Sequence, residues 1–182
     1  TGTLVDGYPA LDGLVAVAVG QSLGGCVLTV QQGRHRTFDG VGFLGWSGIH
    51  TNFPARGGGR IDKPFPTRGS DPFAAEPVFF EADQYTYCFH FDDEPTELVA
   101  ADMAAYGRAD IDLSMRGSTA CPWGSATMPA CAMTMMSPGT VAVEAAMIDV
   151  PVLVGVGERD VVTDPRAEPM AYPASKDITI VE

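Results

Sequence analysis

The chain has 182 residues, of which 46% are hydrophobic and 19% are charged. This length fits one ordinary domain, or a core that carries an insertion, and the apolar share is enough to build a sizeable core. The 11 basic and 23 acidic residues give a net charge of −12. Such a charge argues against nucleic acid or an anionic membrane surface as a partner.

No apolar run approaches the roughly 20 residues of a membrane span. The first residues lack the basic and apolar regions of a signal peptide, and four scattered cysteines indicate free thiols rather than a disulfide scaffold. We therefore expect a cytoplasmic location. We expect neither metal nor cofactor, because no His-rich or Cys-rich group has ligand spacing. The chain begins with Thr1 instead of Met, so we expect it to be an internal part of a longer parent chain.

The first predicted element is a strand over 14–20, a short apolar run of the kind that is buried on both faces of a parallel sheet. A glycine-rich turn follows, and then a helical pattern that is expected to end at Gly33. A second strand is predicted over 41–45. Strand, helix and strand in this order form a βαβ unit, which should be right-handed.

The regular pattern returns near the end of the chain. Residues 137–148 predict a helix that Ser137 caps, and 150–157 predict a second doubly buried strand. A short helix near 167–172 and a last strand over 177–181 complete the pattern. The fold class is therefore α/β, with a parallel sheet of about four strands flanked by helices.

The middle of the chain, residues 48–136, differs in composition because it holds most of the prolines and shows no strong strand period. It is too long for a plain crossover, so we interpret it as an inserted cap, mostly helical or irregular, on a core made of 1–47 and 137–182. One helix is predicted over 94–107. The cap aromatics are expected either to form its own small core or to line a pocket; they are Phe79, Phe80, Tyr85, Tyr87, Phe89, Phe91 and Trp123.

A G-x-S-x-G motif, Gly20-Gln21-Ser22-Leu23-Gly24, stands between the first strand and the helix. A nucleophile at such a junction sits on a sharp, strained turn above the sheet edge. Side chains two positions before and after it would clash, which favours Gly20 and Gly24, and the N–H of Leu23 can stabilise an oxyanion. The alternative is a plain glycine-rich turn with an incidental serine.

With VAVAVGQSLGG before VGFLGWSG, and VPVLVGVGERD near the end, the sequence resembles the α/β-hydrolase fold superfamily over 1–47 and 137–182. The resemblance implies that Ser22 is the nucleophile and that Asp160 is the acid of a triad. Asp164 is the second candidate for the acid, although a turn residue before Pro165 is its preferred role.

The family's histidine follows the last strand, and no histidine occupies that place here. We expect the base to lie beyond residue 182, with His50 as the second choice, ahead of His35 and His90. The early strands of the fold and the second oxyanion donor are expected to precede this chain. Trp46 and His50 are placed to face the site.

The resemblance implies a serine hydrolase that cleaves a small or medium ester, or a related acyl compound, through an acyl-serine. Serine at position 22 argues against the branches that start from a carboxylate nucleophile, the dehalogenases and epoxide hydrolases. Two alternatives stay open: an acyltransferase or cofactor-free haloperoxidase-like activity, and a non-catalytic ligand-binding member of the fold. The expected partner is a small-molecule acyl substrate, and the oligomeric state is open.

Overall fold

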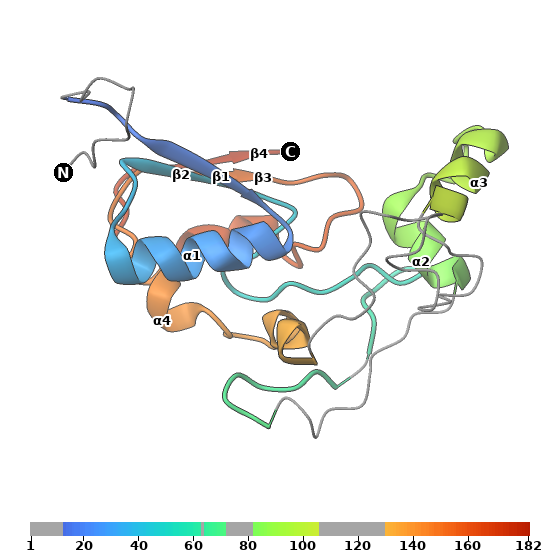
Figure 1. Ribbon diagram of the computed structural model, residues 1–182, viewed down its shortest axis with the longest axis horizontal. Helices are drawn as coiled ribbons and strands as arrows, with labels where there is room; N and C mark the ends of the chain where they lie inside the picture. The colour runs from blue at the N-terminus through green and yellow to red at the C-terminus, as the bar shows by residue number, and fades with distance from the viewer. Residues whose placement is uncertain (1–12, 63, 72–81, 106–129) are drawn as a thin grey trace, which may run out of the picture.

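The computed structural model describes residues 13–62, 64–71, 82–105 and 130–182. Its centre is a parallel sheet in the order β1-β2-β3-β4 (Figure 1). The strands are β1 (Val17–Gln21), β2 (Gly40–Leu44), β3 (Val152–Gly155) and β4 (Ile178–Val181). The prediction of an α/β fold with about four parallel strands is confirmed.

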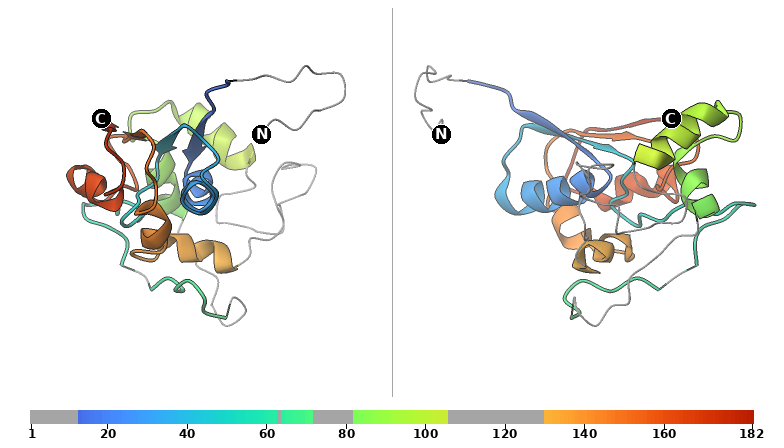
Figure 2. Two further views of the ribbon diagram at one scale, coloured as in Figure 1. Left: turned by 90° about the vertical axis from the view of Figure 1, so that its left-hand side faces the viewer. Right: turned by 45° about the vertical axis from the view of Figure 1, so that its right-hand side comes forward.

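The described helices that pack on the sheet lie on one side of it. Helix α1 (Leu23–His35), the short α4 (Ala142–Ala145) and the 3-10 helix η3 (Pro165–Ala171) lie on the same side in both views of Figure 2. Each new strand is added on the same side of the previous one, and right-handed connections then all cross the same face. A second 3-10 helix, η2 (Ala130–Met136), precedes α4.

The hydrophobic core fills the space between this face and the helices. Alternate residues of β2 and β3 point into it, and the ring of Phe43 stacks on Tyr172 with 5.5 Å between the centroids. Its fully or nearly fully buried members are Leu28, Val41, Phe43, Trp46, Val141, Ala145, Ile148, Val152, Val154 and Tyr172.

The opposite face of the sheet is bare of the described helices. Val17 is 71% exposed and Val19 is 66% exposed, and Leu153 of β3 is also exposed there. The expectation that the first strand and the strand near 150 are buried on both faces is therefore wrong for the residues that the structure describes. The apolar runs satisfy the core face, while α1, α4 and η3 all lie on that side and leave the other face exposed among the described residues.

Two helix boundaries differ from the prediction. Helix α1 continues past Gly33 to His35. A Cβ at Gly33 would come within 2.3 Å of the carbonyl oxygen of Glu144. That glycine allows α4 to approach instead of ending α1. The predicted helix over 137–148 is reduced to α4, and the Ser137 hydroxyl donates to the carbonyl of Pro66 at 2.8 Å instead of capping a helix.

A buried carboxylate fastens α1 to α4 and to the segment 64–71. Glu144 is 3% exposed and accepts hydrogen bonds from Arg34 at 2.7 Å and from Arg68 at 2.8 Å. The two guanidinium groups, Arg68 foremost, lower the pKa of Glu144 to about 2. The carboxylate is thus charged and doubly paired in the folded protein.

Helices α2 (Ala82–Phe89) and α3 (Thr96–Ala105) belong to the predicted cap and lie beyond the end of the sheet to which the strands point (Figure 1). Helix α3 matches the helix predicted over 94–107, of which the last two residues lie outside the described residues. Phe79, Phe80 and Trp123 also lie outside them. Over the described ranges, every helix is too short or too polar to cross a bilayer.

Candidate functional site

The backbone at Ser22 has an unusual conformation for a residue with a side chain. Ser22 stands between the last residue of β1 and the first residue of α1, with φ 51° and ψ −122°. Its N–H donates to the carbonyl of Leu44 at the end of β2, at 2.9 Å, and its own carbonyl accepts from Gly25 at 2.8 Å. A strained turn of this kind costs free energy and persists where the surroundings hold it in place.

The glycines around this turn have different tasks. A Cβ at Gly20 would come within 2.5 Å of the carbonyl oxygen of Gly24, and one at Gly25 would come within 2.5 Å of the Cβ of Trp46. Both positions therefore require glycine for close approach. A Cβ at Gly24 would meet nothing within 4 Å, so the expected clash at that position is wrong.

The first N–H groups of α1 lie directly after β1, at the edge of the sheet where the strands end. Leu23 is the first residue of the helix, so its N–H has no partner within the helix. Such groups, together with the helix dipole, stabilise negative charge. Gln21, the residue before the turn, is exposed. The geometry is compatible with an oxyanion donor at Leu23, and this role stays a prediction.

Ser22 and Asp160 follow strands that point to the same edge of the sheet. Ser22 follows β1 and Asp160 lies in the loop after β3, with β2 between them. Neighbouring strands are about 4.8 Å apart, which puts the two strand ends about 10 Å apart. The imidazole ring of a histidine fits between two side chains that extend from strand ends about 10 Å apart.

The carboxylate of Asp160 is held by its own loop. One oxygen accepts from the N–H of Gly157 at 2.8 Å, and the other accepts from the N–H of Val162 at 2.9 Å. Asp164 is exposed, and its side chain accepts from the N–H of Arg166 at 3.1 Å as the cap of η3. Asp164 therefore has the local role that its position before Pro165 suggests.

The loop after β2 runs beside the loop that carries Asp160. Thr51 and Val162 form an antiparallel bridge, and the N–H of Asn52 donates to the carbonyl of Val161 at 2.9 Å. The hydroxyl of Thr163 donates to the carbonyl of His50 at 3.4 Å. His50 thus lies at the same edge as the acid, half-buried.

The other two histidines lie elsewhere. His35 is the exposed last residue of α1, at the opposite end of the helix from Ser22. His90 is buried near the helices of the predicted cap, with Nδ1 2.9 Å from Glu94 and Nε2 3.0 Å from Asp102. The contact with His90 lowers the pKa of Glu94. His50 is therefore the histidine in the loop that pairs with the acid loop, whereas the ring of His90 is held by Glu94 and Asp102.

A cation–π contact joins the predicted cap to the acid loop. The guanidinium of Arg159 lies 4.4 Å from the ring centre of Tyr87 and 4.2 Å from that of Phe91. It also donates to the carbonyl of His90. These two aromatic rings therefore hold the residue next to Asp160, a role that the sequence does not reveal.

The side chain of Trp46 does not face the candidate site, contrary to the expectation from the sequence, but lies in the core. Its side chain is fully buried under α1, and its indole N–H donates to the hydroxyl of Thr29 at 3.2 Å. The close contact with Gly25 explains this burial, since only a glycine leaves room for the indole there. Trp46 is a core residue.

A buried carboxylate, Glu168, was not identified from the sequence. It accepts from the hydroxyl of Ser47 and, at 3.0 Å, from the N–H of Gly48. Burial raises the pKa of this carboxyl above its ordinary value, and burial likewise raises the pKa of Tyr172 beside it. Through these two hydrogen bonds Glu168 holds the loop after β2 in place. Nothing in the neighbouring sequence, Ala167 and Pro169, indicates that Glu168 is buried.

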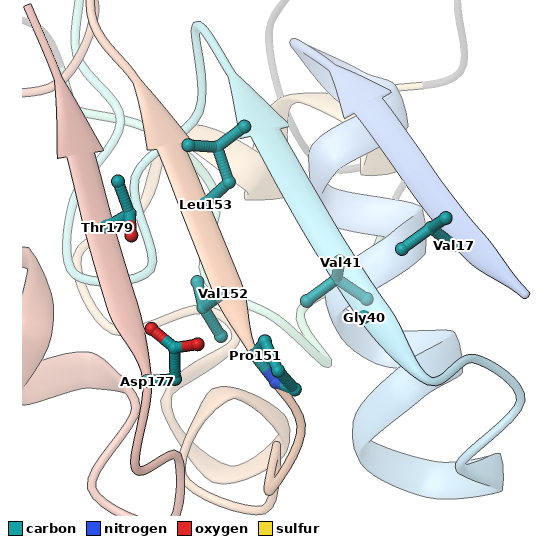
Figure 3. Close-up of a pocket in the computed structure, with 8 residues that line it drawn as sticks. All are labelled: Val17, Gly40, Val41, Pro151, Val152, Leu153, Asp177 and Thr179. Carbon is teal, nitrogen blue, oxygen red and sulfur yellow. The ribbon is translucent and has the colours of Figure 1, made fainter. Parts of the chain in front are cut away.

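A shallow groove of about 240 Å³ lies at the other end of the strands (Figure 3). It is lined by residues at or beside the starts of the four strands, among them Val17, Gly40, Val152 and Asp177. Ser22 and Asp160 follow the opposite ends of the strands, so this groove is separate from the candidate site.

No family model matches the sequence, and no curated protein matches it. Among solved structures, the chain is similar to a variant of an N-formylmaleamic acid deformylase from Pseudomonas putida, with 13% identity and a TM-score of 0.40. It is also similar to a loop variant of a haloalkane dehalogenase from Bradyrhizobium elkanii, with 15% identity and a TM-score of 0.35. These matches cover 90% and 92% of this chain, which spans 57% and 58% of those two proteins.

Proposed function

We propose that this chain carries the nucleophile and the acid of a serine hydrolase that cleaves a small or medium ester or a related acyl compound. The observation that carries the proposal is the strained turn at Ser22, a serine with φ 51° where a strand meets a helix, two strands away from the Asp160 loop. Strain of this kind is concentrated at functional sites.

The proposed reaction proceeds in two stages. A histidine takes the proton of the Ser22 hydroxyl while the oxygen attacks the acyl carbon, and the N–H of Leu23 stabilises the oxyanion. The bond from the acyl carbon to the leaving group then breaks, and the histidine gives its proton to the departing alcohol or amine, which leaves the acyl-serine. The acyl-serine is then hydrolysed by water, with the same histidine as base. Asp160 orients that histidine and stabilises its charged form.

The base is proposed to lie beyond residue 182, and His50 is the alternative within this chain. His50 lies beside the acid loop, which supports keeping it as a candidate. Replacing His50 with Gln distinguishes the two cases. A large loss of serine reactivity assigns the base to His50, and unchanged reactivity leaves it to a histidine outside these residues.

A fluorophosphonate probe tests the proposal, because it reacts with activated serines. We expect labelling of the protein in its full natural length, and we expect Ser22→Ala to abolish it. A matched control is Ser137→Ala, since Ser137 bonds to the loop at 65–66 and lies outside the candidate site. Absence of labelling in the unaltered protein would favour a non-catalytic ligand-binding role.

A further inference from the structure

The side chain of Arg60 joins two loops at the candidate site. One of its terminal nitrogens donates to the carbonyl of Asn52 at 3.0 Å and also to the carbonyl of Asp160. The other donates to the carbonyl of Val162 at 2.7 Å. A single guanidinium therefore joins the loop after β2 to the loop after β3, in which Asp160 lies 100 residues after Arg60.

Arg60 reaches this place by a tight reversal of the chain. Pro54 and Arg60 form an antiparallel bridge, and the N–H of Ala55 donates to the carbonyl of Gly59 at 3.1 Å. The three glycines at 57–59 have positive φ values of 89°, 102° and 78°, which residues with side chains rarely adopt. The turn brings Arg60 back beside Asn52.

The contacts fix the backbone at the acid and over the two residues that follow it. The carbonyls of Asp160 and Val162 accept from Arg60, and the carbonyl of Val161 between them accepts from Asn52. The N–H of Val162 in turn donates to the carboxylate of Asp160. A planar fork of donors suits this arrangement, whereas the ammonium of lysine is a point charge without it.

We propose that Arg60 is a positioning residue, which holds the loop 160–162 so that the Asp160 carboxylate faces the catalytic base. The inference rests on the proposed function, because it gives Arg60 a role only through Asp160. Arg60 takes no proton and touches no substrate. Its effect is the orientation of the carboxylate, and small displacements of such groups cost large factors in rate.

A double-mutant cycle tests the proposal through the rate of fluorophosphonate labelling at Ser22 in the full-length protein. We expect Arg60→Met to lower the rate about 10- to 100-fold when Asp160 is present. In an Asp160→Asn background we expect no further loss from Arg60→Met. Arg166→Met, which removes an exposed arginine near the same loop, is the control and should leave the rate unchanged.

The outcomes separate the two proposals. Equal losses in both backgrounds would mean that Arg60 contributes only to general stability, and the inference would be wrong while serine reactivity stands. Labelling that survives Ser22→Ala would instead remove the proposed function itself. If Arg60→Met does not fold, the same cycle is read with Arg60→Lys, which keeps the charge and loses the fork.

Discussion

Gly25 lies directly against Trp46, so that a Cβ at position 25 would come within 2.5 Å of the Trp46 Cβ. We expect Gly25→Ala to destabilise the protein by about 1–3 kcal/mol, the usual cost of overpacking. Gly24→Ala is the control, because a Cβ there meets nothing within 4 Å. It should be neutral or stabilising by up to about 1 kcal/mol in the first turn of α1. Urea unfolding of both variants measures the difference, and equal losses would contradict the contact.

The strained turn predicts a difference in stability between two variants at position 22. Ser22→Gly relieves a positive φ that costs about 1–3 kcal/mol, partly offset by the greater freedom of glycine in the unfolded chain. We expect the glycine variant to be about 1 kcal/mol more stable than Ser22→Ala, which keeps a Cβ. Chemical denaturation compares the two proteins. Equal stability would mean that the turn at Ser22 is relaxed in solution.

The two acidic candidates predict different losses of serine reactivity. Asp160→Asn is expected to lower the labelling rate by up to about 10⁴-fold, as a triad acid does. Asp164→Asn should have little effect, because asparagine also caps a helix and Asp164 is exposed at the start of η3. Reversed effects would assign the acid to Asp164.

Stability at acidic pH is expected to depend on Glu144. Its pKa falls from 4.5 to about 2 on folding, so its contribution is present above pH 4.5 and is lost as the pH falls toward 2. Glu144→Gln should cost about 3 kcal/mol at pH 7, and the difference from the unaltered protein should shrink by pH 3. Unfolding at several pH values measures this. Asp149→Asn, an exposed ion-pair variant, should cost less than about 1 kcal/mol.

Glu168 predicts the opposite dependence on pH. Burial raises its pKa above 4.5, so its neutral form suits the fold, and stability is lost as the pH rises through the folded pKa. Glu168→Gln should remove this part of the decline and be at least as stable as the unaltered protein near pH 8. Exposed Glu158→Gln serves as the control. A variant that declines in parallel with the unaltered protein would contradict the burial of a titrating carboxyl.

Local signals in the sequence predict the sheet and the turn at Ser22, because short apolar strands and a glycine-rich junction are encoded within a few residues. The role of Gly33 was missed because its reason is the backbone of α4, more than 100 residues away. Arg60 and Glu168 were missed for the same cause. Their partners are carbonyl and N–H groups of distant loops, which no spacing in the sequence reveals.

Arg159 and Asp160 are joined by one peptide unit, yet the first is clasped by the rings of Tyr87 and Phe91 and the second by its own loop. A displacement of α2 therefore pulls on the backbone immediately beside the carboxylate. Helix α2, which carries Tyr87, is in this way connected to the residue directly before the proposed acid.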